Sequence, residues 1–172
     1  TVFSLLITIL ISGKLKLLLA TFEDKKKIIL LFFSGLLIFI NWSVWIYAIS
    51  INQLVEASFG YYIFPILSVF FGNIFLKEVL NFRKKLSILI IFLSIIYMMF
   101  FLENIPWIGL IVALSFSGYA VLRKLIEIET DIGLLIESLF LIPITILIFY
   151  NLNLSNDISF SLSDISLSLI LI

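Results

Sequence analysis

The sequence has 172 residues, of which 63% are apolar and 13% are charged, and its formal net charge is zero. Water-soluble globular proteins carry roughly 25% charged residues, and the mean hydropathy here is +1.28. This composition excludes a water-soluble domain, since too few polar side chains are present to cover its core. Cysteine and histidine are both absent, which excludes disulfides, thiolate metal sites and histidine-based catalysis.

Apolar stretches of helix length follow one another along the chain. In chain order they cover residues 1–12, 28–50, 57–76, 86–102, 106–122 and 132–150, and a further one starts near 162. The complete stretches fall within the about 17–25 residues of a membrane-spanning helix, and the alternating pattern of barrel strands is absent. We therefore predict an all-α, polytopic transmembrane helix bundle. Because the first and last stretches are too short to cross a bilayer, we expect an internal fragment of a longer protein.

Basic residues occur only in every second connection between these stretches. Residues 13–27 hold five, 77–85 hold four and 123–131 hold two. This alternation is what the positive-inside rule predicts for antiparallel helices, so we place these three basic loops in the cytoplasm. The eleven basic residues are Lys14, Lys16, Lys25, Lys26, Lys27, Lys77, Arg83, Lys84, Lys85, Arg123 and Lys124.

Aromatic residues gather near the outer ends of two stretches. Tyr47 and Trp107 lie where an aromatic belt meets the lipid headgroups, and that belt is the simplest interpretation of both. Trp42 and Trp45 lie closer to the middle of the membrane, beside Asn41. For these two tryptophans, the belt and a role in lining a cavity both remain open.

Three polar residues within or at the edge of the membrane need a partner or a function. A charged side chain at the centre of a bilayer costs about 2.5–3.5 kcal/mol on insertion scales. We expect Asn41 to line a cavity. Glu56 either caps the N-terminus of its own helix or has a catalytic or coupling role. Glu137 either pairs with Arg123 or Lys124 near the inner face or serves as the coupling residue.

The stretch 57–76 has one face of small and polar residues. The spacing of a helix places Tyr61, Pro65, Ser68 and Gly72 on that face, and a matching ridge on 106–122 is formed by Gly109, Ala113 and Ser117. Small residues at this spacing allow two helices to pack closely, and Pro65 frees a backbone carbonyl one turn earlier. The face therefore indicates either helix packing or a lined cavity, and we favour the cavity for Tyr61 with Pro65.

Six segments resemble the RarD branch of the EamA-type transporters, which belong to the drug/metabolite transporter superfamily. They are "NWSVWIYA" (41–48), "VEASFGYYIFP" (55–65), "FLKE" (75–78), "PWI" (106–108), "ALSFSGYAVLRK" (113–124) and "GLLIESLFLIP" (133–143). The resemblance implies a ten-helix protein of the bacterial inner membrane, built from two inverted five-helix repeats. Residues 1–102 then form the remainder of the first repeat, and 103–172 form the start of the second.

The resemblance also implies alternating access through a cavity between the repeats. Its matching motifs single out Asn41, Trp45, Glu56, Tyr61, Tyr119 and Glu137. Together with the face of 57–76, we expect the cavity to be lined by Asn41, Trp45, Tyr61, Pro65, Ser68 and Tyr119. Proton coupling through Glu56 or Glu137 is our hypothesis for the driving force.

The function predicted is that of a secondary transporter for a small metabolite or drug-like solute in the lipid bilayer. A non-transporting membrane scaffold or regulatory subunit remains the alternative. We do not expect an enzyme, since the sequence offers no catalytic constellation. We expect no metal or cofactor, because the sequence has no histidine, no cysteine and no metal-ligand spacing. We expect no nucleic-acid partner, because the basic residues are spread over three loops. The sequence carries no signal for an oligomeric state.

Overall fold

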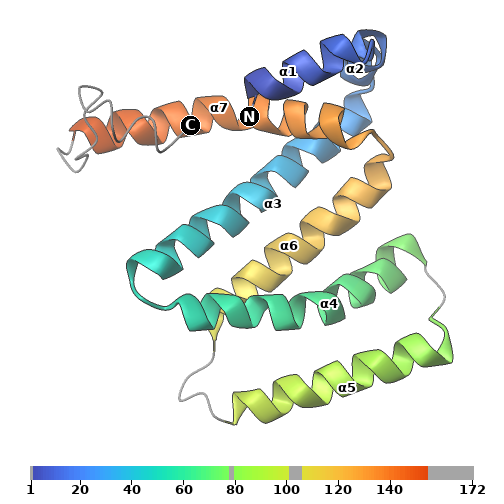
Figure 1. The fold of residues 1–172 in the computed structure, drawn as a ribbon, viewed down its shortest axis with the longest axis vertical. Helices are drawn as coiled ribbons and strands as arrows, with labels where there is room; N and C mark the ends of the chain where they lie inside the picture. The colour runs from blue at the N-terminus through green and yellow to red at the C-terminus, as the bar shows by residue number, and fades with distance from the viewer. Residues whose placement is uncertain (1, 78–79, 101–105, 155–172) are drawn as a thin grey trace.

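The computed structural model describes residues 2–77, 80–100 and 106–154 (Figure 1). Within these ranges the chain forms helices and no strand, which confirms the all-α prediction. The helices are α1 (Val2–Ile11), α2 (Leu15–Glu23), α3 (Lys25–Ser50), α4 (Leu54–Leu76), α5 (Phe82–Met99), α6 (Trp107–Ile126) and α7 (Thr130–Leu154).

Four of the described helices are long and apolar enough to cross a membrane. They are α3, α4, α6 and the part of α7 over Thr130–Ile148. These helices confirm four of the predicted stretches to within a few residues. Helix α5 matches the predicted 86–102, but it begins earlier and therefore carries Arg83, Lys84 and Lys85 in its first turn. The stretch predicted to start near 162 lies outside the described residues.

The predicted extramembrane loop over 13–27 is partly wrong, because Leu15–Glu23 is helical. The segment is rich in leucine, a strong helix former, and Leu18 is buried against the rest of the bundle. Helices α1 and α2 are bent by 114° relative to each other. Gly13 lies at the bend with a φ of +66°, in the left-handed region that favours glycine.

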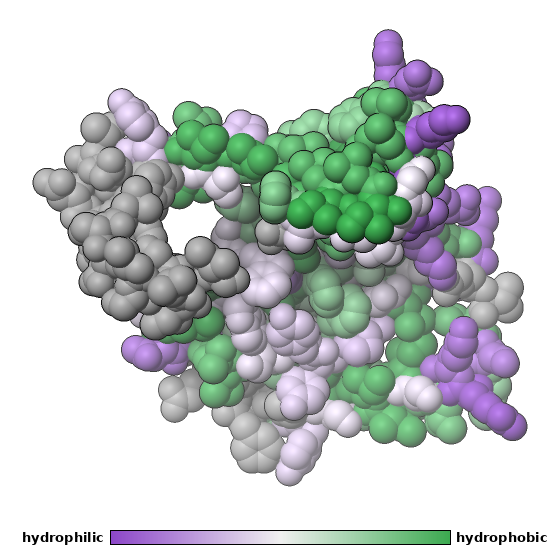
Figure 2. Space-filling model, turned by 45° about the horizontal axis from the view of Figure 1, so that its top comes forward, coloured by the Kyte–Doolittle hydropathy of each residue, from purple (hydrophilic) through white to green (hydrophobic). Residues whose placement is uncertain are grey.

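Successive long helices run antiparallel. In Figure 1 the start of α3, the end of α4, the start of α5, the end of α6 and the start of α7 all lie on the right-hand side. The three basic segments therefore lie at one end of the bundle, here called the basic end. In Figure 2 most of the hydrophilic atoms gather on this same side.

Helix α6 lies between α3 and α4 and packs extensively against both. The closest approach is between Gly60 of α4 and Gly109 of α6. A Cβ atom added to Gly60 would lie 2.5 Å from the Gly109 carbonyl oxygen, and one added to Gly109 would lie 2.6 Å from the carbonyl oxygen of Glu56. The two backbones are therefore in direct contact, as small residues permit in membrane helix pairs.

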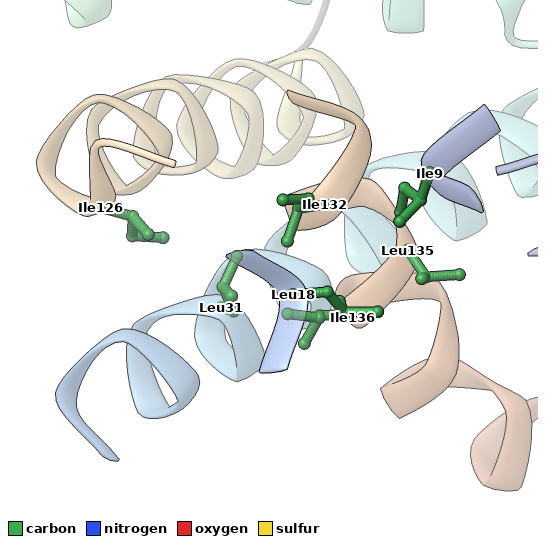
Figure 3. Packing of buried hydrophobic residues seen from close by; sticks show 7 residues of the cluster. All are labelled: Ile9, Leu18, Leu31, Ile126, Ile132, Leu135 and Ile136. Atoms are coloured by element: carbon green, nitrogen blue, oxygen red, sulfur yellow. The ribbon is translucent and has the colours of Figure 1, made fainter. Parts of the chain in front are cut away.

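A cluster of buried apolar side chains joins five helices at the basic end (Figure 3). Helices α1, α2, α3 and α6 each contribute one residue and α7 contributes three. Helices α1 and α2 are thereby fixed against α3 and α7. The residues are Ile9, Leu18, Leu31, Ile126, Ile132, Leu135 and Ile136.

Candidate functional site

A row of aromatic side chains crosses α3, α4 and α6. Trp45 of α3 packs edge-on against Tyr61 of α4 with 5.3 Å between ring centroids. Tyr61 lies 6.3 Å from Phe116 of α6, and Phe116 stacks on Tyr119 at 6.2 Å with nearly parallel rings. We call Trp45, Tyr61, Phe116 and Tyr119 the aromatic row. Three of its members were predicted from the sequence, and the structure shows that Phe116 links them.

Asn41 is buried between α3 and α6. Its amide nitrogen donates hydrogen bonds to the Val112 carbonyl (2.9 Å) and to the Ser115 hydroxyl (3.2 Å). Only 4% of Asn41 is exposed, so in this conformation the side chain connects two helices and does not line an open cavity. Interhelical hydrogen bonds of this kind hold membrane helices in register.

A buried carboxylate lies close to Tyr119, which ends the aromatic row. Glu137 of α7 is 2% exposed, and its Oε1 accepts a hydrogen bond of 2.7 Å from the Ser34 hydroxyl of α3. Arg123 of α6 places Nη1 at 3.5 Å from the same oxygen. Tyr119 lies within electrostatic range of the carboxylate. The predicted pairing of Glu137 with Arg123 is therefore present.

The hydrogen bonding of this ion pair is incomplete. Neither Oε2 of Glu137 nor Nη1 of Arg123 has a hydrogen-bond partner, although both atoms are buried. The other guanidinium nitrogen, Nη2, donates a long hydrogen bond of 3.4 Å to the Thr130 carbonyl. A buried charge needs a nearby opposite charge and full hydrogen bonding to offset its lost hydration. The site can thus accept a proton, a water molecule or a polar group.

Glu56 has a different environment, at the opposite end of the bundle. Its Oε1 accepts a hydrogen bond of 2.9 Å from the backbone N–H of Ile108 in the first turn of α6. Glu56 therefore caps a helix N-terminus, as predicted. The prediction was wrong about which helix, because the hydrogen bond goes to α6 and not to its own helix α4. The partners are 52 residues apart in the chain, so the local sequence could not identify α6 as the capped helix.

Pro65 lies on a separate surface from the aromatic row. It lines a groove of about 390 Å³ between α4 and α5, together with Val69, Arg83, Lys84 and Ser87. Ser68 lies in the same helix and is partly buried.

The remaining predicted aromatic residues point away from the helix bundle. Trp42, Tyr47 and Trp107 are 60%, 58% and 64% exposed, respectively, as expected for side chains that face lipid or headgroups. Trp42 therefore differs from Trp45, which is partly buried against Tyr61.

An ion-pair group at the basic end of the bundle ties the bend between α1 and α2 to the start of α7. Lys14 donates a hydrogen bond of 2.7 Å to Asp131 and also pairs with Glu129. Hydrogen bonds to these two carboxylates raise the pKa of Lys14 above its usual value. In the described part of the chain, no three acidic side chains come together as a metal site would require.

Sequence reasoning missed three residues that shape these sites: Ser34, Gly60 and Phe116. Ser34 and Gly35 form a small pair within α3, and a pair of this kind in an apolar helix could have indicated a close neighbour. Phe116 gave no signal, because phenylalanine is common throughout this chain and only its neighbours in space distinguish it.

Comparison with known proteins gives a consistent family assignment. Residues 1–100 match the EamA-like transporter family. The chain is 39% identical over 119 residues to the uncharacterized transporter YojE of Bacillus subtilis, covering 69% of this chain and 40% of YojE. It is 31% identical over 149 residues to the protein RarD of Salmonella typhi, covering 87% of this chain and 51% of that protein. RarD of Escherichia coli is likewise 31% identical over 150 residues, with the same coverage.

The chain covers about half the length of the two RarD proteins and 40% of YojE. No solved structure matches it significantly.

Proposed function

The chain belongs to the EamA-like transporter family, and from this membership we propose that the full protein moves a small organic solute across a bacterial membrane by alternating access. The relatives that match are named as transporters or as RarD. Four of the described helices are long and apolar enough to cross a membrane. Alternating access requires a site that can be open to one side of the membrane at a time.

The observation that carries this proposal is that an aromatic row from three helices leads toward a buried carboxylate. Aromatic faces bind flat or amphipathic solutes through stacking and edge contacts. The row lies where α3, α4 and α6 meet, and Tyr119 at its end is close to Glu137. We propose that the row contacts the solute and that the solute is a small metabolite or drug-like molecule with an aromatic or apolar portion.

We further propose that Glu137, rather than Glu56, couples proton movement to transport. Glu137 lies between three helices and has one oxygen without a hydrogen-bond partner. A buried carboxylate of this type can exchange a proton when helix movement exposes it. Glu56 instead is bonded to the backbone of α6, which is a structural role.

The test uses the full-length protein in liposomes that contain a pH-sensitive dye. Amino acids, nucleosides, aromatic metabolites and amphenicol-type drugs are added one at a time, and proton flux is recorded for wild type, Glu137→Gln and Glu56→Gln. We expect one solute class to evoke flux in wild type and in Glu56→Gln, and no flux in Glu137→Gln.

Two other results would contradict parts of the proposal. Uptake of a labelled solute without proton flux would indicate facilitated diffusion and would leave Glu137 with a structural role. If no solute crosses, the alternative of a non-transporting scaffold gains support. That alternative also predicts that single cysteines at Tyr61 and Ser68 do not react with water-soluble maleimides.

A further inference from the structure

Among the residues that the structure describes, Arg123 is the one cation beside Glu137. Ser34 of α3 contacts its Oε1, while Arg123 and Tyr119 of α6 are the ionisable groups beside it. Helix α1, which also packs against α7, has no ionisable residue. Asp131, the other acidic residue of α7, is engaged by Lys14. Whether Glu137 is ionised in this conformation therefore depends on Arg123.

The distance between Arg123 and Glu137 is long for a buried ion pair. Hydrogen-bonded ion pairs between a guanidinium and a carboxylate have N–O distances of about 2.7–2.9 Å. Here the distance is 3.5 Å, and the side chains of Arg123 and Glu137 are only 14% and 3% exposed. The guanidinium stabilises the carboxylate by its charge but does not close a hydrogen bond on it. A small displacement of Arg123 would therefore change the balance between the ionised and the protonated carboxyl group.

Gly133 creates the space that the guanidinium occupies. A Cβ atom added to this residue of α7 would lie 1.7 Å from Nη1 and 2.6 Å from Cζ of Arg123. Any side chain at this position would push the guanidinium away. Gly133 is one turn before Glu137 on the same helix, so the cation and the carboxylate are placed against neighbouring turns of α7.

We propose that Arg123, seated on Gly133, is the positioning residue that keeps Glu137 deprotonated in this conformation, an inference that rests on the proton coupling proposed above. When α6 and α7 move apart, the guanidinium withdraws and Oε2 of Glu137 takes up a proton. The carboxylate becomes a neutral carboxylic acid, and Arg123 keeps its charge. When the helices return, the guanidinium favours release of the proton.

The experiment measures the protonation of Glu137 directly and does not require a known solute. Dicyclohexylcarbodiimide modifies buried carboxyl groups in their protonated form, and mass spectrometry quantifies the product on Glu137. The full-length protein in liposomes is labelled over a range of pH. Without the cation, we expect Arg123→Gln to be labelled up to a pH about one unit higher than wild type. Arg123→Lys keeps the charge and should restore most of the wild-type profile.

Two glycine variants provide a matched pair. Gly133→Ala displaces the guanidinium and should shift labelling in the same direction as Arg123→Gln. The same change should add no further shift in the Arg123→Gln background. Gly35→Ala places a Cβ atom 3.6 Å from Glu137, which is an ordinary contact distance, and should follow the wild-type profile.

Equal labelling of wild type, Arg123→Gln and Gly133→Ala at every pH would overturn the inference. If Arg123→Gln does not fold, the comparison of Gly133→Ala with Arg123→Lys still tests the inference, because only Gly133→Ala should shift the labelling profile. The flux assay separates this inference from the proposed function. A labelling shift without solute-evoked proton flux supports the control of Glu137 by Arg123 and refutes proton coupling. Flux together with an unchanged labelling profile refutes the role of Arg123.

Discussion

At the scale of single residues, Trp42 and Trp45 show how neighbours on one helix differ in role. Both belong to α3, three positions apart. Trp42 is 60% exposed on the outside of the bundle, whereas Trp45 packs against Tyr61 on α4. Only Trp45 therefore belongs to the surface that we propose contacts the solute.

This difference predicts different kinetics for two matched variants. Trp45→Ala removes an aromatic contact of about 0.5–1.5 kcal/mol, which corresponds to an increase in KM of roughly 2–10-fold. Trp42→Ala removes an exposed ring outside the aromatic row and should change KM by less than about 2-fold. Uptake of the solute identified in the flux screen gives both values. Equal effects of the two substitutions would argue against the aromatic row as the contact surface.

The two glutamates could not be assigned separate roles from the sequence. Each lies in or near an apolar stretch, and each had a structural and a coupling interpretation. Their contacts in space distinguish them, because Glu56 binds the backbone of α6 whereas Glu137 lies between Ser34 and Arg123. Ser34 is 103 residues from Glu137 in the chain, so no local pattern could identify it as a partner.

At the scale of helices, apolar length located the helices, since every complete predicted stretch corresponds to a helix in the structure and four of these are long and apolar enough to cross a membrane. Hydropathy did not predict α2, because charged residues before and after its nine residues made the whole segment resemble a loop. Hydropathy also did not predict the point of closest helix approach. The predicted small-residue ridge on 106–122 included Gly109, which does lie at the contact. On α4, however, the contact is at Gly60 and not at Ser68 or Gly72.

The crossing at Gly60 predicts a large effect of a single methyl group. In Gly60→Ala the new Cβ atom would lie 2.5 Å from the Gly109 carbonyl, so α4 and α6 must separate. Overpacking of this kind costs about 1–3 kcal/mol, and we expect a lower melting temperature in detergent. Gly35→Ala, whose Cβ atom meets only ordinary contacts, is the control. Equal melting temperatures for the two variants would show that the crossing is not tightly packed.

At the scale of the whole molecule, the basic segments share one end of the antiparallel bundle. The alternation of basic residues among the connections between the apolar stretches predicted this grouping from the sequence. The side of the membrane on which that end lies follows only from the positive-inside rule. The division of the chain into residues 1–102 and 103–172 of two repeats stays a prediction.

The cytoplasmic position of the basic end can be tested with single cysteines, because the chain itself contains none. Lys26→Cys and Lys85→Cys place a thiol at the basic end, and Gln53→Cys places one in the connection between α3 and α4. All three positions are exposed. They are introduced into the full protein after replacing any cysteine that lies outside this chain.

We expect a membrane-impermeant maleimide to label Gln53→Cys in intact cells and to label the two basic-end variants only after permeabilisation. The reason is that lysine and arginine near the ends of spanning helices are retained on the cytoplasmic side during insertion. Labelling of Lys26→Cys and Lys85→Cys in intact cells, with Gln53→Cys protected, would invert the topology. The Arg123–Glu137 pair would then lie nearer the outer face, and Glu137 would meet the proton from the opposite side of the membrane.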